Sequence, residues 1–194
     1  MGMRSKVSLR GALNSAAVTL LFVISLNASA QVQGDPALSC PDSRGGALQV
    51  NNNQVLGWKF NTRNTFLERG NVVGTIVAIL PSVPSHIRFV IQIGKHYSPK
   101  NLCASDTVEI IYNREFGEVD AKDLYLGANV QACGDYITSN APNGRYNASP
   151  ACALVHWVHI NPKQGPHAHG YLRVNGNIYG HLYGGRGGNE PARR

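Results

Sequence analysis

The segment from His86 to Ile93 constrains the fold most, because its apolar residues recur at every second position, the period of a β-strand. One face of this strand would carry the apolar side chains Ile87, Phe89, Ile91 and Ile93. Residues 72–80, 107–113 and 130–137 are also rich in β-branched residues, and no segment keeps a helical period over three turns. The sequence therefore predicts an all-β or mostly β domain.

Turn signals separate these segments at short intervals. Residues 81–85 (PSVPS) hold two prolines, and Asn175-Gly176, a strong hairpin signal, lies between 171–174 and 177–180. Many short strands joined by turns fit either a β-sandwich or a small barrel. The order of long and short strands favours the barrel. We expect a small antiparallel OB-like β-barrel of about five strands with a C-terminal hairpin.

The N-terminus has the three parts of a secretory signal. Arg4, Lys6 and Arg10 precede the apolar run 16–26, and Ala-Ser-Ala at 28–30 matches a cleavage site. We therefore expect residues 1–30 to be a cleaved signal peptide and the mature protein to be periplasmic or secreted; a retained signal anchor is the alternative. A second apolar run that could span a membrane is not found, so we expect no integral membrane association after cleavage.

The rest of the chain divides by composition. Residues 31–70 are polar and aperiodic and are expected to be a leader or linker, whereas 71–183 carry the predicted OB-like domain. Residues 184–194 (GGRGGNEPARR) are expected to be a disordered Gly/Arg tail, with a nucleic-acid-binding arm as the alternative. The formal charge is +7, of which three charges lie in the signal, leaving +4. This charge permits a polyanionic partner without requiring one.

The cysteines all lie beyond the signal, at Cys40, Cys103, Cys133 and Cys152. An even number in an exported chain predicts two disulfides, with three connectivities open. We favour Cys133 with Cys152 and Cys40 with Cys103, because the first pair would lie on consecutive strands that a loop brings together. A Cys/His zinc site is the alternative, although the chain has no C-x-x-C sequence.

A segment rich in histidine, residues 152–180, is the strongest candidate for a functional site. It holds four of the seven histidines, which are His156, His159, His167 and His169, and it also holds Trp157. Packing alone does not require so many imidazoles, and imidazole is a common ligand of zinc. On a regular strand, however, His156 and His159 would point to opposite faces. Their convergence would need a bulge or an early end of the strand.

The same segment resembles a bacterial family of small exported proteins, domain of unknown function 3465. The resemblance rests on Ala-Leu-Val-His-Trp-Val-His at 153–159, Asn-Pro at 161–162, His167, Gly-Tyr-Leu at 170–172 and an Asn-Gly hairpin with Tyr179. The strand 74–80, His86 with Arg88 and Phe89, and Gly-Asp-Tyr after Cys133 also look like that family. The pattern covers residues 70–180.

The resemblance implies which residues belong to the family motif, and it implies little about function. These residues are His156, Trp157, His159, Pro162, His167 and Gly170. The chain departs from the pattern at Ile160, where a polar or histidine residue is expected, and at Asn161, where aspartate is common. If that carboxylate held a divalent metal, Asn161 would weaken the site.

Three interpretations of the histidines follow. The first is a module that binds a polymeric or anionic ligand, such as nucleic acid or an anionic glycan, through His156, Trp157, His159, His167, Arg88 and Tyr171. The second is a metal-dependent hydrolase or nuclease, with zinc as the candidate cofactor on His156, His159, His167 and His169. The third is a purely structural role. The chain has no Gly-x-Ser-x-Gly and no His-Glu-x-x-His, so no catalytic residue is assigned, and we expect the binding module.

Overall fold

A computed structural model of the chain describes residues 39–162 and 166–181. Its elements, in chain order, are α1 (Asn52–Asn61), β1 (Leu67–Ile79), β2 (His86–Gln92), β3 (Thr107–Asn113), the short helices η1 (Arg114–Phe116) and η2 (Ala121–Asp123), β4 (Asn129–Thr138), β5 (Ala153–His156), β6 (Tyr171–Val174) and β7 (Asn177–Tyr179). The expected signal peptide and the expected tail at 184–194 lie outside the described residues. Within the described part, no helix is long and apolar enough to cross a membrane.

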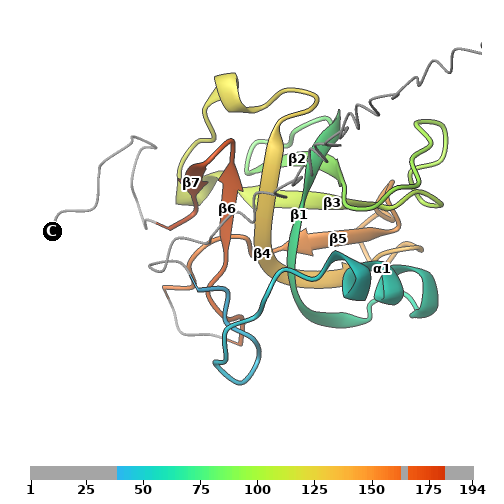
Figure 1. Ribbon diagram of the computed structural model, residues 1–194, viewed down its shortest axis with the longest axis horizontal. Coiled ribbons are helices and arrows are strands. Elements are labelled where there is room, and N and C mark those ends of the chain that lie inside the picture. The colour runs from blue at the N-terminus through green and yellow to red at the C-terminus, as the bar shows by residue number, and fades with distance from the viewer. Residues whose placement is uncertain (1–38, 163–165, 182–194) are drawn as a thin grey trace, which may run out of the picture. The chain divides into compact units, whose positions relative to one another are not determined.

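Five strands close into an OB-like barrel in the order β1-β2-β3-β5-β4, because β1 also pairs with β4. This closure confirms the predicted fold, with one refinement: β3 and β5 run parallel, so the barrel is mixed and not wholly antiparallel. In Figure 1, β1, β4 and β6 run side by side and β3 and β5 cross behind them. The expected C-terminal hairpin is β6–β7, and its turn residues Asn175 and Gly176 both have positive φ.

The long strand β1 belongs to both halves of the barrel. Its first part, residues 67–75, pairs with β4, and residues 75–79 pair with β2, with a bulge between Ile76 and Ala78. A bulge bends a strand and increases its twist, which lets one strand serve two neighbours. Gly74 lies at this crossing, where a Cβ would come within 2.1 Å of the Gln92 carbonyl oxygen. Only glycine allows the two strands to approach so closely.

The barrel interior is filled by the apolar face predicted for β2. Ile87, Phe89, Ile91 and Ile93 are all buried in one cluster, together with Val108, Ile110, Tyr112 and Val155 of β3 and β5. Because side chains alternate along a strand, Arg88 of β2, Glu109 of β3 and His156 of β5 lie on the outer side of the barrel. Packing of the core residues therefore determines that Arg88, Glu109 and His156 point away from the barrel interior.

Residues 52–70, expected to be leader or linker, instead hold α1 and the start of β1. The Asn51 side chain caps α1 by accepting from the Gln54 N–H, and Trp58 packs 5.3 Å from the Tyr136 ring, between centroids. Lys59 is buried, and its Nζ donates to the carbonyl oxygens of Leu102, Ser105 and Thr107. A helix of ten residues that buries a lysine has no clear apolar stripe, which is why the sequence pattern missed it.

Two disulfides form, as predicted, but the favoured pairing was wrong. Cys40 bonds Cys133, and Cys103 bonds Cys152. The register of β4 and β5 pairs Thr138 with Ala153, so Cys152 lies beyond one end of the paired segment while Cys133 lies beyond the other. Five residues of strand separate Cys133 from Thr138, about 16 Å, too far for a disulfide.

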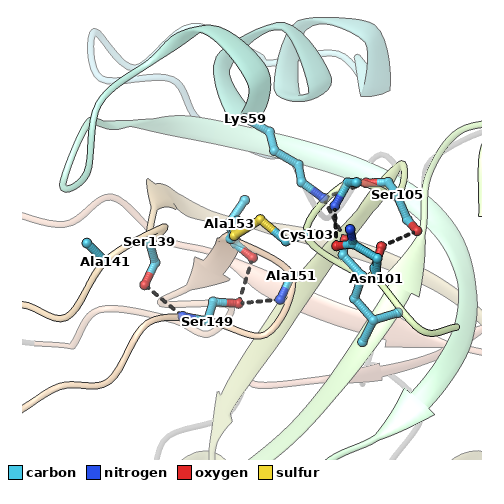
Figure 2. The surroundings of a disulfide bond; sticks show 12 residues. Lys59, Asn101, Cys103, Ser105, Ser139, Ala141, Ser149, Ala151 and Ala153 are labelled. Atoms are coloured by element: carbon cyan, nitrogen blue, oxygen red, sulfur yellow. Dashed lines mark hydrogen bonds between the residues drawn. A yellow bond between two sulfur atoms is a disulfide. The ribbon is translucent and has the colours of Figure 1, made fainter. Parts of the chain in front are cut away.

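The Cys103–Cys152 disulfide lies where three segments meet. Figure 2 shows Lys59 reaching from α1 towards Ser105, next to the disulfide. On the other side of the bond, the Ser149 hydroxyl donates to the Ala153 carbonyl oxygen and accepts from the Ala151 N–H. The helix, the loop before β3 and the loop before β5 are thus held together by one covalent bond and a set of backbone contacts.

Candidate functional site

Strand β5 ends at His156, and this early end brings the predicted histidines together. Trp157 has φ of 55°, a left-handed conformation that turns the chain away from the strand. The Trp157 ring then lies 5.6 Å from His156, 5.3 Å from His159 and 4.0 Å from His167, measured between ring centroids. Side chains alternate between two faces only within β5, so the alternation that would have placed His156 and His159 on opposite faces ends at His156.

We call the outer surface formed by His86, His156, Trp157 and His167 the histidine face. The His86 and His156 ring centroids are 5.5 Å apart, and the His167 ring stacks on Trp157 at an interplanar angle of 11°. His86 comes from β2, His156 from β5 and His167 from the segment before β6, so three separate parts of the chain supply the imidazoles. The Nδ1 atom of His86 contacts the Ser85 hydroxyl at 2.8 Å.

A buried carboxylate, Asp135, fixes one end of the histidine face. It lies opposite His156 in the β4–β5 register and opposite Arg69 in the β1–β4 register. Its Oδ1 accepts from Arg69 Nη1 at 2.7 Å, and its Oδ2 lies 2.5 Å from His167 Nδ1. Because an ionised carboxylate can only accept, His167 Nδ1 carries the hydrogen and Nε2 is left for another partner.

A second buried carboxylate, Glu109, lies at the other end. The Arg88 Nε donates to its Oε1 at 2.7 Å, and the Glu109 side chain is 0% exposed. Its Oε2 has no hydrogen-bond partner among the described residues. Neither Asp135 nor Glu109 was predicted as a site residue. The sequence signal for Glu109 is a single acid within a run of β-branched residues, and Asp135 has no comparable signal because its strand also holds Asn129, Gln131 and Thr138.

Two predicted binding residues are buried in the fold and offer no surface to a ligand. His159 is 2% exposed, stacks on Phe116 with ring centroids 3.7 Å apart, and places Nδ1 2.7 Å from the Ile160 carbonyl oxygen. Tyr171 is 4% exposed and packs against the Cys40–Cys133 disulfide, and its hydroxyl accepts from the Gln131 amide. Of the two, His159 packs against the face through the Trp157 ring, whereas Tyr171 belongs to the cluster around the disulfide.

The zinc prediction gains no support from the geometry. Within residues 39–162 and 166–181, no group of three or more His, Cys, Asp or Glu side chains is placed to hold a metal ion. His169 uses Nδ1 to accept the Asn161 backbone N–H, and the Nδ1 atoms of His159 and His167 also contact protein atoms. Zinc binding by His156, His159, His167 and His169 stays a prediction.

A pocket of about 360 Å³ opens beside His167. Its walls include Asp42 and Ser43 on one side and Asn161, His167 and His169 on the other. The Cys40–Cys133 disulfide joins the segment that holds Asp42 and Ser43 to β4, and Cys133 lies two residues before Asp135 in that strand. The pocket therefore continues the histidine face towards the N-terminal segment.

Burial favours the neutral form of two imidazoles of the face, His86 and His156. It lowers the pKa of His156 to about 4, with smaller contributions from His86 and His159, and it also lowers the pKa of His86, which Arg88 lowers further. Burial lowers the pKa of His159 as well. The face thus combines the imidazoles of His86 and His156, whose pKa values are lowered, with two ion pairs, Arg69–Asp135 and Arg88–Glu109, whose formal charges cancel.

We expect the protein to lose stability on mild acidification. In the unfolded chain His156 titrates near pH 6.5, and in the folded protein near pH 4, so between these values the unfolded state binds more protons. The free energy of unfolding should therefore fall as pH decreases from about 6.5 to 4, with His156 contributing up to about 1.4 kcal/mol per pH unit.

Urea unfolding at a series of pH values measures this slope. The His156→Gln variant should show a shallower slope than wild type, whereas His96→Gln, which changes an exposed histidine, should not. Equal slopes for wild type and His156→Gln would contradict the assignment.

Comparison with known proteins gives no further guide to this site: no protein-family model, curated protein or solved structure matches the chain.

Proposed function

We propose that this protein is an exported OB-like module that binds an anionic glycan at the histidine face. The observation that carries the proposal is the convergence of imidazole and guanidinium groups with unused nitrogens. Nε2 of His86 and both ring nitrogens of His156 make no hydrogen bond with the described residues, and Arg88 uses only Nε. A neutral imidazole carries one N–H, so each of these two rings can donate one hydrogen bond. A carboxylate or sulfate group accepts hydrogen bonds from such donors.

The surroundings of Trp157 favour a glycan over a nucleic acid. Proteins that bind single strands stack bases on exposed aromatic rings. Here His167 stacks on Trp157, and His156 and His159 lie around the same ring, while Tyr171 is buried. The arginines of the site are already paired with carboxylates, so the face has no surplus of cations for a phosphate backbone. A glycan with separate anionic groups can be held by individual N–H donors of His86, His156 and Arg88.

Titration calorimetry of the mature protein with oligogalacturonate tests the proposal. We expect binding, and we expect the double variant His86→Gln/His156→Gln to weaken it about tenfold or more, because two hydrogen bonds to a charged group are lost. The His96→Gln variant changes the same chemistry away from the face and should bind like wild type. Absence of glycan binding together with salt-dependent retention of single-stranded DNA or RNA would replace the glycan by a nucleic acid.

Acid–base chemistry on the bound polymer is a second candidate, favoured by one observation. The contact between His167 Nδ1 and Asp135 Oδ2 orients the imidazole as in a base with its positioning carboxylate. In the calorimetric mixtures, shortening of the polymer that His167→Gln abolishes without loss of binding would support this candidate. Loss of cleavage with a chelator and its rescue by zinc would support the metal-dependent hydrolase predicted from the sequence.

A further inference from the structure

The second oxygen of Glu109 is one of three buried side-chain atoms without a hydrogen-bond partner among the described residues, with Arg114 Nε and Arg173 Nε, and it is the only acceptor of the three. The side chain is fully enclosed, Oε1 is bound by Arg88, and Oε2 has no hydrogen-bond partner among the described residues. A buried carboxylate oxygen without a donor destabilises a fold, because its desolvation is not compensated. Such an oxygen is explained if a ligand supplies the donor.

Arg88 leaves complementary groups unused beside this oxygen. It contacts Glu109 through Nε alone, and its terminal nitrogens make no hydrogen bond with the described residues. The Arg88 side chain is 31% exposed, so it connects the enclosed carboxylate to the surface. Glu109 pairs in register with Leu154, two residues before His156, which places the pair at the border of the histidine face.

We propose that Arg88 and Glu109 form a subsite for a sugar hydroxyl next to the anionic group held by the histidine face. The hydroxyl donates to Glu109 Oε2, and a neighbouring hydroxyl oxygen accepts from a terminal nitrogen of Arg88. To admit the sugar, the Arg88 side chain turns outward. This subsite rests on the proposed glycan-binding function and specifies the chemistry of the ligand: a polymer with free hydroxyls beside its anionic groups.

A metal cation is the other group that an unpaired carboxylate oxygen attracts, and the neighbours of Glu109 argue against it. Its register partners are Val90 and Leu154, which offer no oxygen, nitrogen or sulfur ligand in their side chains. The guanidinium of Arg88 places a positive charge within hydrogen-bond distance of the same carboxylate. A hydroxyl needs only one acceptor and carries no charge, so it fits this environment better.

Two polyanions separate hydroxyl recognition from plain electrostatic attraction. Oligogalacturonate carries carboxylates and hydroxyls, whereas polyacrylate carries carboxylates at a higher density and no hydroxyls. If charge alone governs binding, wild type prefers polyacrylate. If the subsite operates, wild type prefers oligogalacturonate by about tenfold or more, as expected for a hydrogen bond to a carboxylate.

For the Glu109→Gln variant, electrostatic attraction alone and hydroxyl recognition predict opposite changes in the affinity for oligogalacturonate. The variant removes one negative charge, so electrostatics alone makes both polymers bind more tightly. With the subsite lost, oligogalacturonate binds about tenfold more weakly and polyacrylate does not. Glu118→Gln, an exposed residue paired with Arg114, makes the same charge change as a control. Tighter binding of oligogalacturonate by Glu109→Gln would overturn the inference.

The polymer comparison on wild type does not depend on whether Glu109→Gln folds. Equal binding of both polymers by wild type would overturn the subsite and leave the binding function in place. Binding of neither polymer would overturn the binding function itself, and with it the subsite.

Discussion

Replacing Asp135 by Ala should lower the free energy of unfolding by about 3–5 kcal/mol, the largest effect expected from a single substitution at the site. The side chain is 6% exposed and joins Arg69, itself 7% exposed, to His167. Without the carboxylate, the Arg69 guanidinium stays buried, and its remaining partners among the described residues are the carbonyl oxygens of Pro41 and His169 and the Cys133 sulfur, none of them charged. Urea unfolding followed by circular dichroism measures the loss.

Two further variants show whether the ion pair is the cause. Asp120→Ala removes an exposed carboxylate paired with Lys122, and its free energy of unfolding should stay close to that of wild type. The double variant Arg69→Met/Asp135→Leu should recover most of the stability lost in Asp135→Ala, because a buried ion pair is readily replaced by apolar side chains. If Asp135→Ala is as stable as wild type, the Arg69–Asp135 pair does not contribute to stability.

Removing either disulfide should lower the free energy of unfolding by about 4–5 kcal/mol in the chain-entropy model. Each bond closes a long loop, because Cys40 and Cys133 are 93 residues apart in the sequence and Cys103 and Cys152 are 49 apart. The two variants should nevertheless differ in local structure. Replacing Cys40 and Cys133 by serine frees the wall of the pocket that contains Asp42 and Ser43, whereas replacing Cys103 and Cys152 does not.

Limited trypsin digestion distinguishes the two variants, because Arg44 lies in the turn next to Cys40. The Cys40→Ser/Cys133→Ser variant should be cut after Arg44 under conditions where the folded Cys103→Ser/Cys152→Ser variant is not. Each variant is compared with wild type by thermal unfolding under the same conditions. Equal cleavage at Arg44 in both would show that the first disulfide does not anchor this segment.

The strands were predictable because their signals are local. The alternation in β2 and the Asn-Gly turn of the C-terminal hairpin depend on residues a few positions apart, and the structure has β3 at Thr107–Asn113, as predicted. From the sequence, the early end of β5 could be given only as a condition for bringing His156 and His159 together. It could not be predicted, because a positive φ at Trp157 is unusual for a bulky residue. Tertiary packing, not local preference, decides that turn.

The parts that the sequence did not reveal depend on which strands become neighbours. Asp135 and Glu109 acquire their roles only when β4 meets β5 and β1, and when β3 meets β2. The same holds for the disulfides, because the β4–β5 register excludes the pair Cys133–Cys152. His159 and Tyr171 matched the residue types of a binding surface, but the turn after β5 and the pairing of β6 with β4 bury them.

The interleaved disulfides have a consequence for biosynthesis. A nascent chain exposes Cys40 and Cys103 before Cys133, so the earliest oxidation available joins two cysteines that are not partners in the native protein. Such a bond is corrected only by thiol attack and exchange, a slow reaction without an enzyme. The yield of native protein should therefore depend on disulfide isomerase activity in the compartment where the chain folds, and a strong oxidant alone should trap the misbridged form.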